Sequence, residues 1–169
     1  VKIPLLVSQL AKENYEIKCV LTKNAEKLIK PLSLSILSRN PCILEEDQWS
    51  CSKSSPLHIE LCNWADVLVI APLTATTLSK WVTGNADGLI PSILMANIKP
   101  IIIAPAMNTQ MWLNKAVQKN YENLQSYDNV LSLHPSEGLL ACDAIGIGKI
   151  PPNDLIQLAL EFIALHKQN

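Results

Sequence analysis

The sequence predicts an α/β protein in which helices flank a doubly wound parallel sheet. Short apolar runs, such as residues 67–71 and 101–104, alternate along the chain with stretches of helical spacing. Such alternation is typical of a parallel sheet whose strands are buried on both faces. Hydrophobic residues make up 49% of the chain and aromatic residues only 5%, as expected for aliphatic strands covered by helices. A chain of 169 residues can form a complete core, and we predict a single domain over residues 1–169.

Charge and hydropathy exclude several classes of protein. The formal net charge is -1, so neither nucleic acid nor an acidic membrane surface is an expected partner. The apolar runs are far shorter than the ~20 residues of a membrane-spanning helix, and no signal peptide is visible. Five cysteines without C-x-x-C spacing argue against a disulfide framework or a metal site, and they favour a reducing cytoplasm. The cysteines are Cys19, Cys42, Cys51, Cys62 and Cys142.

In the first third of the chain, the sequence predicts helices, one short strand and one long loop. Ile3, Leu6 and Leu10 fall on one face of a first helix. The loop contains the acidic run Glu45-Glu46-Asp47, which we interpret as a solvated edge rather than a metal site. In chain order, the expected elements are a helix at 1–14, a strand at 16–21, a helix from 22 to about 30 capped by Thr22 or Asn24, a helix at 32–38, and the loop at 39–56.

In the rest of the chain, the sequence predicts three more strands and five more helices. Each strand is a short apolar run, and Gly84-Asn85-Ala86-Asp87-Gly88 separates two of the helices. In chain order, the expected elements are a helix at 57–64, a strand at 66–71, a helix from the turn at 72–77 to about 82, a helix at 89–96, strand 101–104, helix 114–126, strand 130–133, a loop with glycines at about 136–150, and a helix at 152–167 with proline at its start.

The segment Pro105-Ala106-Met107-Asn108-Thr109-Gln110-Met111-Trp112 follows a predicted strand directly. Open α/β sheets bind their ligands at the carboxyl ends of strands. One amide, Asn108, among large apolar side chains suits a pocket that holds a flat ring beside a polar group. Alternatively, Met107, Met111 and Trp112 simply pack the junction between strand and helix. The composition of the segment leaves both interpretations open.

Other residues at the predicted strand ends belong to the same rim of the sheet. Thr22 and the turn at 72–77 lie there, and so does His134. Hydroxyls and backbone N–H groups at the start of a helix can hold an anion or the polar edge of a ring. Ordinary capping by Thr74 is the alternative. Gly146-Ile147-Gly148-Lys149 fits neither nucleotide-binding glycine motif.

Two titratable side chains have patterns that suit proton transfer. His58 lies at the start of a predicted helix, where the dipole disfavours the imidazolium and leaves a neutral base. A surface histidine is the alternative. Cys142 lies in a loop beside Asp143, which opposes thiolate formation and therefore suits a proton donor better than a nucleophile. Cys19, in contrast, is predicted to lie in the core of a strand.

Taken together, these motifs resemble the flavin-dependent cysteine decarboxylases. These include the phosphopantothenoylcysteine decarboxylases of coenzyme A synthesis and the decarboxylases of lantibiotic peptide cysteines. The segment 105–112 resembles their P-x-M-N-x-x-M-W motif, and His58-Ile59-Glu60-Leu61 resembles the segment with the active-site histidine. Residues 66–77 and 84–89 resemble the flavin-binding A-P-x-T-A-N-T and G-x-A-D-[DN]-L-L stretches, with Gly88 in place of Asp or Asn. Residues 138–149 resemble the flexible substrate clamp G-x-L-A-C-G-x-x-G-x-G-[RK].

The resemblance implies a Rossmann-like flavoprotein fold, FMN as cofactor, and decarboxylation of 4′-phosphopantothenoylcysteine to 4′-phosphopantetheine. In that scheme the thiol-bearing carbon is oxidised, carbon dioxide leaves, and the product is then reduced and protonated. The resemblance assigns His58 as the base or orienting group, Asn108 as the carboxylate holder and Cys142 as the final proton donor. The FMN contacts would be Thr22, Pro72, Thr74, Thr77, Asp87 and Met107, and the substrate contacts would be Asn108, Met111, Ala141 and Lys149.

The resemblance also implies a homotrimer, or an assembly of trimers, in the cytoplasm. A first strand and a phosphate-binding loop would precede Val1, so we expect an upstream segment of which Lys2 is the only remnant. The synthetase domain often fused to bacterial members is not expected within residues 1–169. Two alternatives stay open: a non-catalytic regulatory subunit with the same fold, and a peptidyl-cysteine decarboxylase. The clamp with Cys142 favours the coenzyme A branch over the peptide branch.

Overall fold

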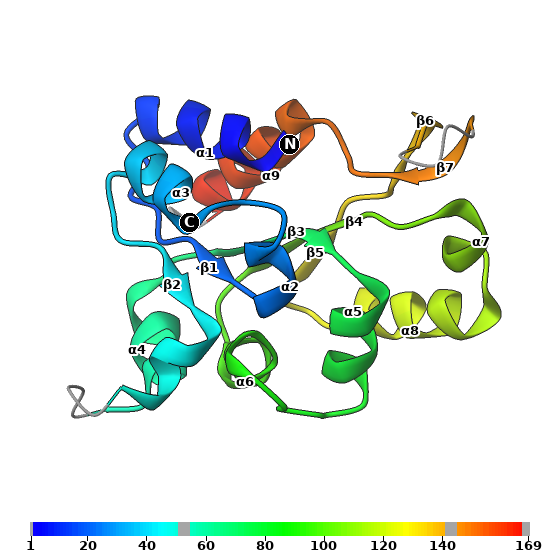
Figure 1. Ribbon diagram of the computed structural model, residues 1–169. Coiled ribbons are helices and arrows are strands. Elements are labelled where there is room, and N and C mark those ends of the chain that lie inside the picture. Colours follow the sequence, from blue (N-terminus) through cyan, green and yellow to red (C-terminus); the bar gives the residue numbers. More distant parts are fainter. Residues whose placement is uncertain (1, 51–54, 141–144, 167–169) are drawn as a thin grey trace. The chain divides into compact units, whose positions relative to one another are not determined.

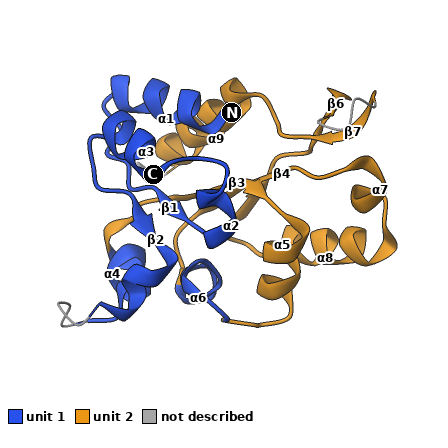
Figure 2. Cartoon of the chain, in the orientation of Figure 1, with its two compact units in different colours: residues 1–63, 87–96 blue, residues 64–86, 97–169 orange. Residues whose placement is uncertain are grey.

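A computed structural model describes residues 2–50, 55–140 and 145–166 (Figure 1). The chain divides into two compact units (Figure 2). Unit 1 comprises Val1–Asn63 and Asp87–Ala96, and unit 2 comprises Trp64–Ala86 and Asn97–Asn169. Among the described residues, no helix is both long and apolar enough to cross a membrane. Nor does any cluster of three or more potential metal ligands occur in that part of the chain.

Unit 1 is mostly helical, with one pair of short parallel strands. Its strands pair in the register Val20↔Ile43 and Leu21↔Leu44. Helices α1 and α3 pack against each other, and their buried side chains Val7 and Leu34 meet Leu21 in one apolar cluster. The elements are α1 (Lys2–Lys12), β1 (Val20–Leu21), α2 (Lys23–Glu26), α3 (Pro31–Ser38), β2 (Ile43–Leu44), the 3-10 helix η1 (Glu45–Trp49), α4 (Leu57–Trp64) and α6 (Leu89–Ala96).

Unit 2 contains a three-stranded parallel sheet with helices packed on it. Strand β4 lies between β3 and β5, and its β-branched run Ile101–Ile103 is completely buried. Helix α9 packs against β4, and α8 packs against β5 and α5. The elements are β3 (Leu68–Leu73), α5 (Ala75–Val82), β4 (Ile101–Pro105), α7 (Thr109–Trp112), α8 (Lys115–Gln125), β5 (Val130–Ser132), β6 (Ser136–Leu139), β7 (Ile145–Lys149) and α9 (Asn153–His166).

The predicted fold class is confirmed, because parallel strands alternate with helices along the chain. Four local predictions were wrong. The loop predicted at 39–56 contains β2 and η1, and the loop predicted at about 136–150 is an antiparallel hairpin of β6 and β7. The strand predicted at 16–21 is paired only at Val20–Leu21, because its partner β2 is equally short. Helix α2 ends at Glu26 rather than near residue 30.

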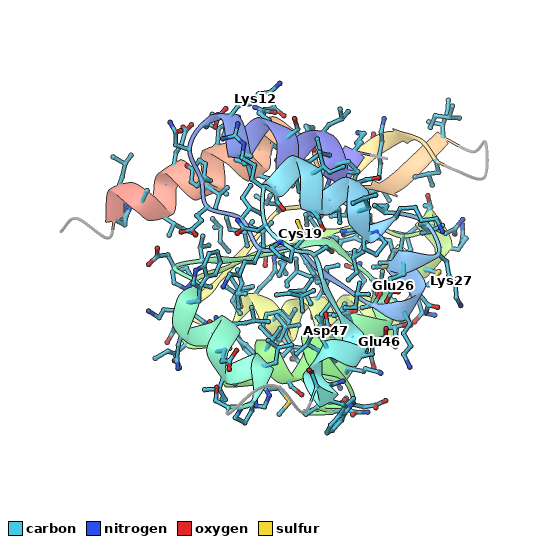
Figure 3. The ribbon with its side chains drawn as sticks, turned by 60° about the vertical axis from the view of Figure 1, so that its left-hand side comes forward. Lys12, Cys19, Glu26, Lys27, Glu46 and Asp47 are labelled. Atoms are coloured by element: carbon cyan, nitrogen blue, oxygen red, sulfur yellow. The ribbon has the colours of Figure 1, made fainter. Side chains whose placement is uncertain are left out.

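The acidic run is also not the solvated edge that the sequence predicted. Asp47 Oδ2 accepts a hydrogen bond from Leu44 N at 2.7 Å, and so caps η1. Glu45 Oε1 accepts one from Leu89 N at 2.5 Å, at the start of α6. Only Glu46 of the three is exposed. Figure 3 labels Glu46 and Asp47 on η1, and Glu26 at the end of α2 with Lys27 directly after it.

Candidate active site

The turns that follow β3 and β4 lie beside each other at the carboxyl ends of these strands. Leu73 pairs with Pro105 in the sheet register, and Ala106 N donates a hydrogen bond to the Leu73 carbonyl at 3.2 Å. Parallel pairing therefore brings the turn at 72–77, here called the threonine turn, and the 105–112 segment to one rim, as the sequence predicted. A ligand at this rim would meet groups from both turns.

The threonine turn presents two neighbouring hydroxyl groups. Thr74 is the N-cap of α5, and its Oγ1 accepts a hydrogen bond from Thr77 N at 3.4 Å. The two hydroxyl oxygens lie 3.2 Å apart. Thr74 and Pro72 are exposed, and Thr77 is half-buried. Thr74 thus caps α5, which was the alternative to a ligand-binding role. Its hydroxyl nevertheless lies at the surface of the rim, where a ligand could reach it.

The 105–112 segment forms a turn followed by the short helix α7. Asn108 is the N-cap, and its Oδ1 accepts a hydrogen bond from Gln110 N at 2.8 Å. This bond fixes the orientation of the amide, whose other end, Nδ2, is a hydrogen-bond donor. Met107 is half-buried and Asn108 is exposed. The amide therefore lies at the surface beside a partly covered thioether.

The apolar side chains of the 105–112 segment could either line a ligand pocket or pack the junction between strand and helix, and the structure separates them. Trp112 is only 2% exposed, and its ring stacks edge-to-face on Tyr121 and His134, with centroids 4.9 and 5.5 Å away. Trp112 therefore packs the junction between strand and helix. Met111, in contrast, is 49% exposed and can contact a ligand. His134 belongs to the aromatic packing around Trp112.

The hairpin β6–β7 packs directly on the 105–112 segment. Met107 N donates a hydrogen bond to the Gly148 carbonyl at 2.9 Å. Gly148 has a φ of 129°, and a Cβ there would collide with the Met107 carbonyl oxygen. A Cβ at Gly146 would likewise collide with the Thr109 hydroxyl. The two glycines lie two positions apart on one strand, so they share a face, and that face lies against the segment.

This contact between the two motifs is the main feature that sequence reasoning missed. The signal was present in the alternation of Gly146 and Gly148 with Ile147 and Lys149, a period of two. Lys149 is half-buried, and its side chain runs alongside Gly138, where an added Cβ would lie 3.2 Å from Nζ. The predicted site residues Ala141 and Cys142 lie outside the described residues.

Three further predicted site residues belong to unit 1. Thr22 is the N-cap of α2, and its Oγ1 accepts a hydrogen bond from Ala25 N at 3.1 Å. His58 lies half-buried in the first turn of α4. Asp87 is exposed and precedes the turn that begins α6. The structure thus groups Pro72, Thr74, Thr77, Met107, Asn108, Met111 and Lys149 within unit 2, and Thr22, His58 and Asp87 within unit 1.

Burial favours the neutral thiol at all three cysteines of the described residues. Burial raises the pKa of Cys19 and of Cys62. Burial, with smaller contributions from Cys19, Glu26 and Asp47, raises the pKa of Cys42 to about 11. Cys19, labelled in Figure 3, is half-buried. A reactive thiolate is therefore not expected at these three positions.

Comparison with known proteins identifies the family. Residues 1–163 match the family described as Flavoprotein. The chain belongs to the Flavoprotein family. The flavoprotein is 34% identical over 151 residues to the coenzyme A biosynthesis bifunctional protein CoaBC of Borreliella burgdorferi, covering 89% of this chain and 38% of that protein. It therefore spans less than half the length of this curated relative.

Solved structures resemble the flavoprotein over most of their length. A mutant PPC decarboxylase complexed with pantothenoylaminoethenethiol has a TM-score of 0.82 and 34% identity, covering 92% of this chain and 87% of that one. The FMN binding protein AtHal3 has a TM-score of 0.78 and 35% identity, covering 92% and 85% of the two chains. The predicted relationship to this family is confirmed.

Proposed function

We propose that this flavoprotein is an FMN-dependent lyase that decarboxylates 4′-phosphopantothenoylcysteine to 4′-phosphopantetheine in coenzyme A biosynthesis. One observation carries the proposal. At neighbouring strand ends of unit 2, the turn that carries Met107, Asn108 and Met111 lies beside the turn that carries the hydroxyl pair of Thr74 and Thr77. The likeness to a PPC decarboxylase structure with a bound substrate analogue supports the same substrate class.

The groups at this rim fit a flavin. The two turns combine uncharged hydrogen-bonding groups with thioether side chains, which suit the polar edge and the flat face of a ring. When bound, FMN supplies reversible two-electron oxidation chemistry. The residues that would hold it are Thr22, Pro72, Thr74, Thr77, Asp87 and Met107. The likeness to an FMN binding protein supports this choice of cofactor.

The chain's own residues would bind the substrate and move its protons. Asn108 uses Oδ1 for its cap, so Nδ2 is the end that would donate to the substrate carboxylate. His58 would act as the base or orienting group when the thiol-bearing carbon is oxidised. Cys142 would protonate the product. Met111, Ala141 and Lys149 would complete the substrate contacts, with the Lys149 ammonium suited to a phosphate.

We further propose that the protein assembles as a homotrimer, or as several trimers, in the cytoplasm. Exposed apolar side chains support association, because they repeat along one face of α9. They are Leu155, Leu158, Phe162 and Leu165, which are 42%, 57%, 53% and 66% exposed. Light scattering of the purified protein would give the mass directly, and a monomer at all concentrations would contradict this part of the proposal.

The activity is tested by supplying FMN and three substrates to the purified protein. We expect carbon dioxide release from 4′-phosphopantothenoylcysteine, much slower release from the form without phosphate, and none from a peptide with carboxyl-terminal cysteine. Release from the peptide alone would favour a peptidyl-cysteine decarboxylase. FMN binding without release from any substrate would favour a non-catalytic subunit.

A further inference from the structure

A carboxylate from the segment before α4 holds the start of α6. Glu45 is the first residue of η1, is half-buried, and lies 44 positions before Leu89 in sequence. Its Oε1 accepts the hydrogen bond from Leu89 N at 2.5 Å, and Gln48 Nε2 donates to the same oxygen at 3.4 Å. An ionised acceptor makes such a bond short and strong. The negative charge also faces the positive end of the α6 dipole.

The turn before α6 is shaped to receive this carboxylate. Gly88 has a φ of 117°, a backbone conformation that favours glycine, and a Cβ there would lie 2.5 Å from Glu45 Oε1. On its other side, the Gly88 carbonyl accepts hydrogen bonds from Ser92 Oγ at 2.7 Å and Ser92 N at 3.1 Å. The backbone of residues 88–89 is therefore held from both sides.

Glu45 is itself held in place by its neighbours in sequence. Asp47 caps η1 through its bond from Leu44 N, and Leu44 belongs to β2, which pairs with β1. The position of Glu45 thus depends on the strand pair of unit 1. Glu46, between the two capping acids, is exposed, so the three adjacent acidic residues have different structural roles.

We propose that Glu45 is a positioning residue for FMN binding, acting through the turn on Asp87. By fixing the backbone at Gly88 and Leu89, it sets the direction in which the preceding residue, Asp87, presents its side chain. This inference rests on the proposed function, in which Asp87 contacts the flavin. Glu45 itself makes no contact with the cofactor in this proposal.

The first experiment measures the FMN affinity of variants by the change in flavin fluorescence, at a temperature where each variant is folded by circular dichroism. Glu45→Ala should weaken FMN binding about tenfold, which corresponds to roughly 1.4 kcal/mol and lies within the range for the loss of a capping interaction. Glu45→Gln keeps an oxygen acceptor without the charge, so it should weaken binding only about threefold. The matched control is Glu46→Gln, which changes the adjacent exposed carboxylate and should leave the affinity unchanged.

A double-mutant cycle separates positioning from a general structural effect. If Glu45 acts through Asp87, then Glu45→Ala should change FMN affinity less than about twofold in an Asp87→Ala background. Independent, multiplicative effects of the two substitutions would overturn the inference. So would a Glu45→Ala variant that is less stable but binds FMN as well as the wild type does.

These outcomes distinguish the inference from the proposed function. A wild-type protein that binds no FMN would overturn the proposed function and this inference with it. A wild-type protein that binds FMN, together with a folded Glu45→Ala variant of equal affinity, would overturn the inference alone.

Discussion

Each unit of the molecule contains a glycine against which a distant segment is packed, but the two contacts differ in kind. In unit 2, Gly148 lies against the backbone carbonyl of Met107. In unit 1, Gly88 lies against the carboxylate end of the Glu45 side chain. A backbone group cannot move without its whole segment, whereas a carboxylate can rotate away. The hairpin in unit 2 is thus held rigidly, and the α6 turn in unit 1 is held by a charge that can be displaced.

The largest effect should follow a side chain added at Gly148. Gly148→Ala introduces a strained φ and a collision with the Met107 carbonyl, and should cost roughly 3 kcal/mol or more at this site. Because the collision can be relieved only by separating β7 from the 105–112 segment, decarboxylation should fall at least about a hundredfold. The assay is carbon dioxide release, together with limited proteolysis of the hairpin.

Gly146→Ala is the matched control on the same strand face. Gly146 lacks a positive φ, and its neighbour is the Thr109 side chain, which a second substitution, Thr109→Ala, can shorten. The single variant should lose activity moderately, and the pair should recover it. If Gly148→Ala retains wild-type activity and protease resistance, the hairpin is not held as we describe.

A smaller effect is expected at Gly88. Gly88→Ala should lower the free energy of unfolding by about 1–2 kcal/mol, mainly through backbone strain. The Glu45 carboxylate can swing away, so folding should survive while FMN affinity falls. Urea unfolding and FMN titration measure the two effects separately. If Gly88→Ala lowers the free energy of unfolding as much as Gly148→Ala does, the side-chain contact at Gly88 is as rigid as the backbone contact at Gly148.

The half-buried thiol of Cys42 should make the stability of unit 1 depend on pH at the alkaline end. The pKa of Cys42 is raised from 9.0 to about 11 in the folded protein, by burial first and then by Cys19, Glu26 and Asp47. The folded state therefore holds this proton more tightly than the unfolded chain does. Its contribution to stability is complete below about pH 9 and is lost as the pH rises towards about 11.

Cys42→Ser removes this titration and should flatten the decline in unfolding free energy over that range. The comparison is urea unfolding of the variant and the wild type at several alkaline pH values. Tyr121, whose pKa is also raised by burial, contributes in the same direction in both proteins. Parallel pH profiles for the two proteins would contradict the assignment to Cys42.

Local patterns were sufficient to predict the fold class and most of the longer elements. The all-apolar run that became β4, and the polar caps at Thr22 and Thr74, act over a few residues and can be read directly. The cap at Asn108 and the short helix α7 that it begins were not predicted. The placement of the 105–112 segment at a strand end follows from the same rules. Strand β2 has only two residues, too few to produce a periodic signal.

The contacts that hold the candidate site could not be predicted, because they join residues far apart in the chain. Leu89 bonds to a carboxylate 44 positions earlier, and Gly148 meets Met107 although α7, α8, β5 and β6 lie between them in sequence. A single sequence shows that a glycine or an acid is present, but not what it meets. For this reason the acidic run was interpreted as solvated surface, although Asp47 and Glu45 accept hydrogen bonds at the starts of η1 and α6.

In the proposed mechanism, Asn108 binds the carboxylate that is lost as carbon dioxide. Asn108→Asp tests it most directly, because aspartate is an equally good N-cap for α7 but replaces the Nδ2 donor by a negative oxygen. With FMN bound, we predict unchanged unfolding free energy and FMN affinity, and a fall in kcat/KM for 4′-phosphopantothenoylcysteine of about a hundredfold or more. A wild-type kcat/KM in this variant would show that Asn108 does not bind the substrate carboxylate.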